Sequence, residues 1–212
     1  VGNEVSSEIK LYNMDCMEAM KQMPDKAFDL AIVDPPYGIG FDGQKENRDT
    51  NRKFHEFKGW DSQIPSKEYF ENLFRVTANS IIWGGNYMVE NLRNSRCWLA
   101  WDKIQEFSGS DFELAWTSFD RPAKSFRKSR VESYCGISKI HPTQKPVALY
   151  KWILKNYAKP GDKILDTHLG SGSIAIACYD MGFDLTGYEI DKDYYDAAVN
   201  RLENHKKQLT LF

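Results

Sequence analysis

The hydrophobic residues of this chain follow two patterns: short continuous runs, and longer stretches with apolar side chains every three or four positions. The runs at 28–34, 80–85, 97–103, 111–119, 162–167 and 184–191 predict strands. The stretches at 15–23, 66–77, 146–157, 170–182 and 192–206 predict helices. Asp15 and Ser66 can cap two of these helices, and Pro146 starts a third. Alternating strands and helices predict an α/β fold with a mostly parallel sheet, one antiparallel pair (97–103 with 111–119) and helices on both faces.

Length and composition narrow the class of protein. A chain of 212 residues can bury one good-sized core, so we expect a single domain over 1–212. The formal net charge of -2 argues against a protein that coats nucleic acid indiscriminately. The four cysteines are widely separated, which predicts reduced thiols and no metal site. No apolar stretch is long enough to span a bilayer and the first residues do not form a signal peptide, so we expect a soluble cytoplasmic protein.

The first strand of this set ends in Asp34, Pro35, Pro36 and Tyr37. An exocyclic amino group on a nucleobase is a poor nucleophile, because its lone pair is delocalised into the ring. Two acceptors aimed at its hydrogens, the Asp34 carboxylate and the Pro35 carbonyl, favour a more tetrahedral nitrogen. The prolines fix the backbone, and the Tyr37 ring offers a face for stacking. The alternative is a proline turn with a surface tyrosine, but the four residues in this order favour chemistry on an amino group.

A second unusual strand end lies in the sequence LDTHLGSGS, where Asp166 is followed by a glycine loop and a helix. Small residues let backbone N–H groups and a helix N-terminus approach a ligand. Glu189 follows Gly170 by 19 residues, a spacing that suits a carboxylate on a ribose. A tight turn and a capping acid would give the same pattern. Ligands of open parallel sheets collect at the carboxyl ends of strands, so we expect the two strand ends to be neighbours.

Three motifs in this order resemble a known family. Asp34-Pro35-Pro36-Tyr37, then HPTQKP at 141–146, then LDTHLGSGS at 165–173 are similar to the motifs of the circularly permuted beta class of DNA amino-methyltransferases. The resemblance covers nearly the whole chain. It implies a Rossmann-like fold, S-adenosylmethionine as cofactor, double-stranded DNA as substrate, extrusion of the target base from the duplex, and a bacterial or phage origin.

The resemblance also implies roles for individual residues. Asp34, Pro35, Pro36 and Tyr37 are expected to be catalytic. The expected cofactor-binding residues are Asp15, Cys16, His141, Thr143, Gln144, Lys145, Asp166, Gly170, Ser171, Gly172, Ser173 and Glu189. Two positions depart from the family's pattern: Met14 stands where a glycine is usual, and His168-Leu169 precedes the glycine loop where relatives carry Phe. His168 has two interpretations: it faces the cofactor and tunes its binding, or, as we expect, it is a solvated histidine with a hydrogen-bond partner.

The expected division of the chain is a catalytic half (about 9–120), a short DNA-contact segment (about 121–140), a cofactor-binding half (about 141–206) and a tail (207–212). The irregular stretch 121–130 is rich in cations, and its proposed phosphate contacts are Arg121, Lys124, Arg127, Lys128 and Arg130. The polar loop at 41–65 offers a weaker set, Lys45, Arg48, Arg52 and Lys53. The short segment predicts short or relaxed sequence recognition, aided by a homodimer of the kind that relatives form.

Several alternatives stay open at this stage. Cytosine N4 is the rival target to adenine N6, although cytosine enzymes more often carry Ser at the position of Asp34. A catalytically inactive DNA-binding subunit is a more distant alternative. The tail resembles the pentapeptide that binds bacterial sliding clamps, through Gln208, Leu209, Leu211 and Phe212. A tail that folds back onto its own domain is the competing interpretation.

Overall fold

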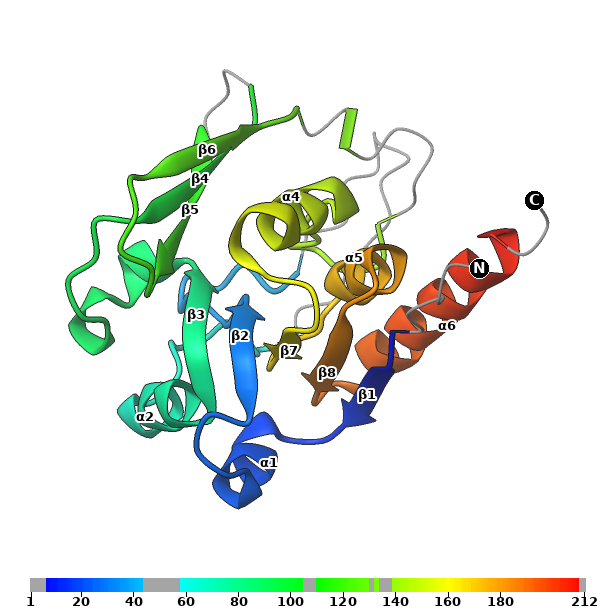
Figure 1. Cartoon of the computed structure of the whole chain (residues 1–212), viewed down its shortest axis with the longest axis horizontal. Coiled ribbons are helices and arrows are strands. Elements are labelled where there is room, and N and C mark those ends of the chain that lie inside the picture. The colour runs from blue at the N-terminus through cyan, green and yellow to red at the C-terminus, as the bar shows by residue number, and fades with distance from the viewer. Residues whose placement is uncertain (1–6, 44–57, 105–109, 130–131, 134–138, 210–212) are drawn as a thin grey trace.

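The computed structural model describes residues 7–43, 58–104, 110–129, 132–133 and 139–209. Its helices are α1 (Cys16–Gln22), α2 (Lys67–Val76), α4 (Val147–Tyr157), α5 (Ser173–Met181) and α6 (Lys192–Leu209), with short 3-10 turns η1 (Gly85–Tyr87) and η2 (Val89–Asn91). Its strands are β1 (Ile9–Asn13), β2 (Phe28–Val33), β3 (Thr77–Trp83), β4 (Trp98–Asp102), β5 (Phe112–Thr117), β6 (Lys124–Arg127), β7 (Lys163–Asp166) and β8 (Asp184–Glu189). Figure 1 shows these strands as one twisted sheet with helices on either side.

The strands are ordered β1-β8-β7-β2-β3-β5-β4-β6. Strand β5 runs antiparallel to both of its neighbours, β3 and β4, and every other neighbouring pair is parallel. The predicted antiparallel pair is therefore confirmed, with Trp98 of β4 opposite Trp116 of β5. The mostly parallel sheet predicted from the alternation of elements is confirmed as well.

Two hydrophobic cores lie on the two faces of the sheet. Successive side chains of a strand point to opposite faces, so Leu30 and Ile32 of β2 pack with α4, α5 and α6, whereas Ala31 and Val33 pack with α1 and α2. All four side chains are buried, which explains why β2 reads as a continuous apolar run rather than an alternation. Among the described helices, none is both long and apolar enough to cross a membrane.

The helix starts expected from the sequence are confirmed. The Asp15 carboxylate accepts the N–H of Met17 at 2.8 Å, and the Ser66 hydroxyl accepts the N–H of Tyr69 at 3.3 Å. These bonds satisfy donors that the first turn of a helix leaves unpaired. Pro146 is the N-cap residue of α4.

The two edge strands were not predicted. Residues 124–127, which the sequence suggested were irregular, form β6 and pair in parallel with β4, from Leu99 opposite Lys124 to Asp102 opposite Arg127. That prediction was wrong because Phe126 is the one apolar residue of the strand, so no alternation marks it. Strand β1 pairs with β8 and is likewise only partly buried.

Several residues of the sequence analysis lie outside the described residues: Lys45, Arg48, Arg52, Lys53, Arg130, Leu211 and Phe212. Gln208 is exposed near the end of α6, and the last helical residue is Leu209.

The position of the site follows from one pair of strands. Strand β2 lies between β7 and β3, and all three are parallel. Along the chain, β2 leads to β3 on one side of the sheet, whereas β7 leads to β8 on the other. Connections that diverge in this way leave a crevice beyond the carboxyl ends of the two central strands. Asp34 follows β2 and the glycine loop follows β7, so both expected strand ends open into this crevice.

Candidate active site

The turn after β2 is held by a buried carboxylate. Asp61 is 3% exposed, and its Oδ1 accepts the N–H groups of Tyr37 at 2.6 Å and Gly38 at 2.9 Å. Its Oδ2 accepts the N–H of Phe41 at 2.7 Å. Hydrogen bonds to an ionised acceptor are stronger than neutral ones, so Asp61 fixes the backbone that carries the four catalytic candidates. The Tyr37 hydroxyl in turn donates to Asp34 Oδ1 at 2.7 Å.

The Tyr37 ring lies in a slot formed by the loop after β3. Gly84 has a φ of +68°, and a Cβ added there would stand 2.1 Å from a ring carbon of Tyr37. Tyr87 stacks on the Tyr37 ring with centroids 5.2 Å apart and planes 16° apart. Tyr87 is itself 44% exposed. The slot therefore requires a glycine at position 84 and orients the tyrosine whose hydroxyl binds Asp34.

The ammonium group of Lys145, which the family resemblance places near the cofactor, pairs with the Asp34 carboxylate. Lys145 is buried, and its Nζ lies 2.5 Å from Asp34 Oδ2 and 3.2 Å from the Tyr37 hydroxyl. The same Nζ is 3.2 Å from Glu113 Oε2. Lys103 completes the row, because its Nζ is 2.9 Å from Glu113 Oε1. Two carboxylates and two ammonium groups thus alternate along one wall of the site.

Burial and charge act against each other in this row. Burial raises the pKa of Asp34, and the Lys145 ammonium opposes that rise without cancelling it. Burial alone would raise the pKa of Glu113, but Lys145 and Lys103 hold it below its ordinary value. Burial disfavours the charged form of Lys145, yet Asp34 and Glu113 raise its pKa above the ordinary value. Pairing with Lys145 thus opposes the effect of burial on both carboxylates.

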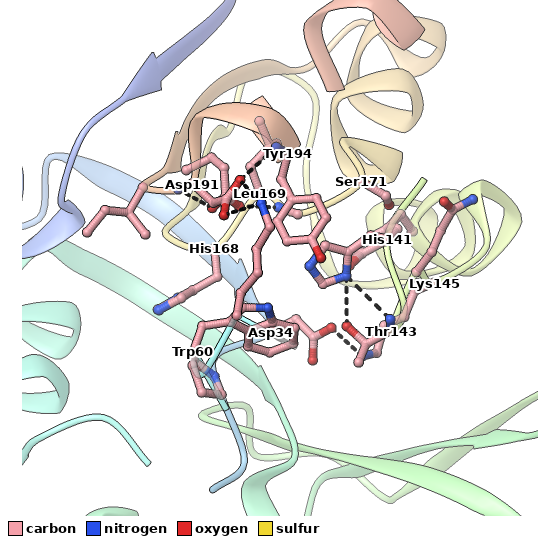
Figure 2. Close-up of a pocket in the computed structure, with 17 residues that line it drawn as sticks. Asp34, Trp60, His141, Thr143, Lys145, His168, Leu169, Ser171, Asp191 and Tyr194 are labelled. Atoms are coloured by element: carbon pink, nitrogen blue, oxygen red, sulfur yellow. Dashed lines mark hydrogen bonds and ion pairs between the residues drawn. The ribbon is translucent and has the colours of Figure 1, made fainter. Parts of the chain in front are cut away.

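A cavity of about 400 Å³ opens between β2 and the glycine loop. Figure 2 shows it with Trp60 and Asp34 at the bottom and Tyr194 and Asp191 at the top. The buried Glu189 carboxylate is fixed by two backbone groups, the N–H of Gly170 at 2.8 Å and the N–H of Asp191 at 2.9 Å. The expected pairing of the glycine loop with the acid that ends β8 is thus present in the structure.

Aromatic rings line the rest of this cavity. The ring of His141 packs between Trp60 and Tyr194, with centroids 5.2 Å and 4.3 Å away. Lys58 lies over the Tyr194 ring at 4.7 Å and binds the Asp191 carboxylate at 2.7 Å. A cavity with flat apolar walls and a fixed carboxylate suits a ligand that carries both a planar base and a hydroxylated sugar.

His168 also faces this cavity. It is half-buried rather than solvated, which corrects one part of the sequence-based expectation. Its Nδ1 lies 2.9 Å from the Thr167 hydroxyl, which confirms the other part, that it has a hydrogen-bond partner. Burial lowers the pKa of His168 to about 4, so the ring is neutral near pH 7.

A second cavity, of about 520 Å³, lies on the other side of Asp34. Pro35, Tyr37, Tyr87 and Glu113 line this cavity but not the first. Six residues line both: Asp34, Pro36, Trp60, Thr143, Gln144 and Lys145. The two cavities therefore share a wall to which Asp34 belongs, an arrangement that can hold two reactants side by side.

Comparison with known proteins identifies this arrangement. The N6_N4_Mtase family model, described as DNA methylase, matches residues 91–200, which is more than half of the chain. The chain belongs to this family. The matched segment of the DNA methylase contains HPTQKP and the glycine loop, while Asp34 to Tyr37 precede it. The protein is thus a DNA amino-methyltransferase of the N6-adenine or N4-cytosine kind, and its motif order is the circularly permuted one.

Curated relatives extend the likeness to almost the full chain. Type II methyltransferase M.HinfI of Haemophilus influenzae is 25% identical over 91% of this chain and 67% of its own length. Type II methyltransferase M.HpaI of Haemophilus parainfluenzae is 26% identical over 92% of this chain and 74% of its own length.

Solved structures share the fold of this methyltransferase. The M1.HpyAVI–SAM complex superposes with a TM-score of 0.57 at 20% identity, covering 92% of this chain and 98% of that one. TTHA0409 from Thermus thermophilus, complexed with S-adenosyl-L-methionine, gives 0.59 at 15% identity, covering 93% and 95%. PvuII DNA methyltransferase (cytosine-N4-specific) gives 0.61 at 12% identity, covering 95% and 91%.

The methyltransferase uses S-adenosylmethionine as its cofactor. The first cavity fits this molecule, because its buried acid is already held in place by two N–H groups and its walls carry aromatic rings, among them Trp60, His141 and Tyr194. Seven of the twelve residues expected to bind the cofactor line this cavity: His141, Thr143, Gln144, Lys145, Gly170, Ser171 and Glu189.

The other five expected cofactor residues stand behind the cavity. Asp15 caps α1, and Cys16 is buried in the core between α1, α2 and the sheet. Ser173 accepts a hydrogen bond from Arg201 of α6 at 2.9 Å, and a Cβ at Gly172 would stand 3.0 Å from Ala198 of the same helix. Asp166 is buried beneath the loop and accepts the N–H of His168 at 3.0 Å. Asp166, Gly172 and Ser173 thus belong to the glycine loop and its surroundings, whereas Asp15 and Cys16 belong to the start of α1.

The cations of the basic segment lie at opposite ends of strand β6. Arg127 is the last residue of β6 and Lys128 follows it. They lie at the carboxyl end of the strand, the same end as Asp34, because β6, β4, β3 and β2 all run in one direction. Arg121 lies before the amino end of β6, away from Asp34. Its guanidinium donates to the Asn156 carbonyl at 2.9 Å, near the end of α4. Lys124 is the first residue of β6 and is exposed.

Sequence reasoning missed several residues of the two cavities: Lys58, Trp60, Lys103, Glu113, Tyr150, Asp191 and Tyr194. Asp191 and Tyr194 lie just past the predicted acid at the end of β8, so the cofactor loop could have been extended to them. Lys103 and Glu113 carried no such signal, because each lies in or beside a strand that was assigned to the core.

Proposed function

We propose that this chain methylates the exocyclic N6 of adenine in double-stranded DNA, with the target base turned out of the helix into the second cavity. The wall that the two cavities share, to which Asp34 belongs, supports this proposal. On this proposal Asp34, Pro35, Pro36 and Tyr37 are the catalytic residues, and the first cavity holds the cofactor.

The shared wall suits methyl transfer to an amino nitrogen. S-adenosylmethionine supplies a methyl group activated by a sulfonium. The Asp34 carboxylate and the Pro35 carbonyl accept the two amino hydrogens, and Tyr37 supports the base. The reaction depends on alignment and exclusion of water more than on a strong base. Asp34 therefore needs to be an ionised acceptor, and does not need to remove a proton before transfer.

We propose adenine and not cytosine as the target base because the motif begins with Asp34. Relatives that act on cytosine N4 more often carry Ser at this position, a difference that belongs to the family resemblance. A duplex buries the target nitrogen, so extrusion of the base costs a few kcal/mol, which phosphate contacts must offset. Arg127 and Lys128 lie at the proper end of β6 for such contacts.

The test is chemical identification of the product. Unmethylated genomic DNA is incubated with the protein and S-adenosylmethionine, digested to nucleosides and analysed by mass. N6-methyladenine is the expected product. Detection of N4-methylcytosine would show that the target base is cytosine and not adenine. Asp34→Asn should abolish transfer while the cofactor still binds, whereas Asp120→Asn, which changes an exposed carboxylate far from the cavities, should have no effect. Absence of transfer by the wild-type protein would favour an inactive DNA-binding subunit.

The finer expectations about partners belong to the same proposal. A short or relaxed recognition sequence predicts methylation in many contexts, and a strict six-base site would contradict it. A homodimer would be detected by sedimentation in the presence of DNA. Binding to a sliding clamp through Gln208, Leu209, Leu211 and Phe212 predicts that deletion of the last five residues abolishes retention on the clamp.

A further inference from the structure

Both oxygens of the Asp34 carboxylate already have a hydrogen-bond partner. Oδ1 accepts the Tyr37 hydroxyl at 2.7 Å, and Oδ2 lies 2.5 Å from the Lys145 ammonium. An amino group that enters the second cavity competes with these two partners for the lone pairs of the carboxylate. Lys145 is the partner to be displaced, since Tyr37 is held in its slot by Gly84 and by the Asp61 carboxylate.

An ammonium that leaves Asp34 inside the protein needs another counter-ion. The Lys145 side chain is 1% exposed, and an unpaired buried charge costs several kcal/mol. The one other carboxylate within ion-pair distance of its Nζ, among the residues that the structure describes, is Glu113 at 3.2 Å. Glu113 is partly exposed at 27% and belongs to β5, in the wall of the second cavity.

Lys103 makes Glu113 fit for this role. Its Nζ binds Glu113 Oε1 at 2.9 Å, which leaves Oε2 directed at Lys145. The group of two carboxylates and two ammonium ions is neutral as a whole. It stays neutral when the Lys145 Nζ moves from Asp34 towards Glu113. Lys145 therefore has two carboxylate partners in this wall, Asp34 and Glu113, and only Asp34 is needed for catalysis.

We propose that Glu113 is a positioning residue that retains the Lys145 ammonium when the target amino group displaces it from Asp34. The proposal rests on the proposed function, because it assumes that Asp34 accepts that amino group. Hydrogen bonds are exchanged and no covalent bond changes. In the free protein Lys145 pairs with Asp34, and in the complex Glu113 takes over the ammonium so that Asp34 can accept an amino hydrogen.

Four proteins test the exchange: wild type, Glu113→Gln, Lys145→Gln and the double variant. Single-turnover methyl transfer is measured at saturating DNA and cofactor. Glu113→Gln should slow transfer about tenfold, since Lys145 then has Asp34 as its sole counter-ion. In the Lys145→Gln background the same change should alter the rate less than twofold, because no ammonium remains to be retained. Equal slowing in both backgrounds, or no slowing in either, would overturn the proposal.

Two controls separate this role from a general loss of structure. Cofactor affinity of Glu113→Gln should stay within twofold of wild type, because Glu113 does not line the first cavity. Glu90→Gln removes the same charge at an exposed position and should leave the transfer rate unchanged.

A thermal-unfolding cycle keeps the test decisive when transfer cannot be measured. If Lys145→Gln is inactive, the unfolding midpoints of the same four proteins are compared, and the proposal expects the two single changes to be strongly non-additive. Additive midpoints would overturn it, since they would show that Glu113 does not hold the ammonium. If the wild-type protein methylates no DNA, the proposed function fails, and this cycle still decides separately whether Glu113 and Lys145 are coupled.

Discussion

The slot around Tyr37 gives the sharpest prediction, through the change Gly84→Ala. Two costs are expected. A left-handed backbone costs a residue with a side chain about 1 to 2 kcal/mol, and Gly84 has a φ of +68°. The new Cβ would also stand 2.1 Å from the Tyr37 ring, so the ring must move and its hydroxyl must leave Asp34. A hydrogen bond to a charged group is worth about 2 kcal/mol.

Gly40→Ala is the matched control. Gly40 has the same φ of +68°, and a Cβ added there would meet no heavy atom within 4 Å. It carries the backbone cost alone. The difference between the two variants therefore isolates the displacement of Tyr37, which at about 2 kcal/mol corresponds to a midpoint roughly 4 to 8 °C lower for Gly84→Ala in a chain of this size.

The assay combines thermal unfolding, cofactor titration and single-turnover methyl transfer. Gly84→Ala should lose most of its transfer activity, because Asp34 and Tyr37 no longer share their hydrogen bond, while cofactor affinity stays within twofold. Gly84 lines the second cavity and not the first, which is why the two readouts separate. If Gly84→Ala matched Gly40→Ala in both unfolding and transfer, the role of the slot would be refuted.

Three further predictions concern the cofactor loop and the DNA contact. Glu189→Gln replaces one acceptor oxygen by an amide, so cofactor affinity measured by calorimetry should fall about 10- to 100-fold, with DNA affinity unchanged. Burial raises the pKa of Asp166 to about 8, so the folded state holds a proton that the unfolded state releases near pH 4. Wild-type stability should therefore fall between pH 4 and 8 relative to Asp166→Asn, by about 1.4 kcal/mol per pH unit, and a constant difference would contradict this. Lys128→Gln should weaken DNA binding and reduce its salt slope by about 0.9, whereas Arg121→Gln, at the opposite end of β6, should do neither.

Much of the fold could be predicted from sequence because the information is local. A buried parallel strand such as β2 needs apolar residues on both faces, and the apolar run from Leu30 to Val33 predicts such a strand. Helix starts at Asp15 and Ser66 depend on a side chain bonding to an amide two or three residues away. The edge strands β1 and β6 escaped prediction, because an edge strand is held by backbone pairing with a partner far along the chain.

The chemistry of the site divides in the same way. Asp34, Pro35, Pro36 and Tyr37 indicate chemistry on an amino group by themselves, because they bring the reactive groups together within four residues, and methylation follows from the resemblance of the three motifs to a known family. The family resemblance assigned Lys145 to the cofactor, whose cavity it lines, and the folded chain also pairs it with Asp34, 111 positions away. Glu113 joins them only because β5 reverses direction beside β3. Strand order and direction decide which charged side chains come into contact across a sheet, and a local sequence pattern predicts neither of them.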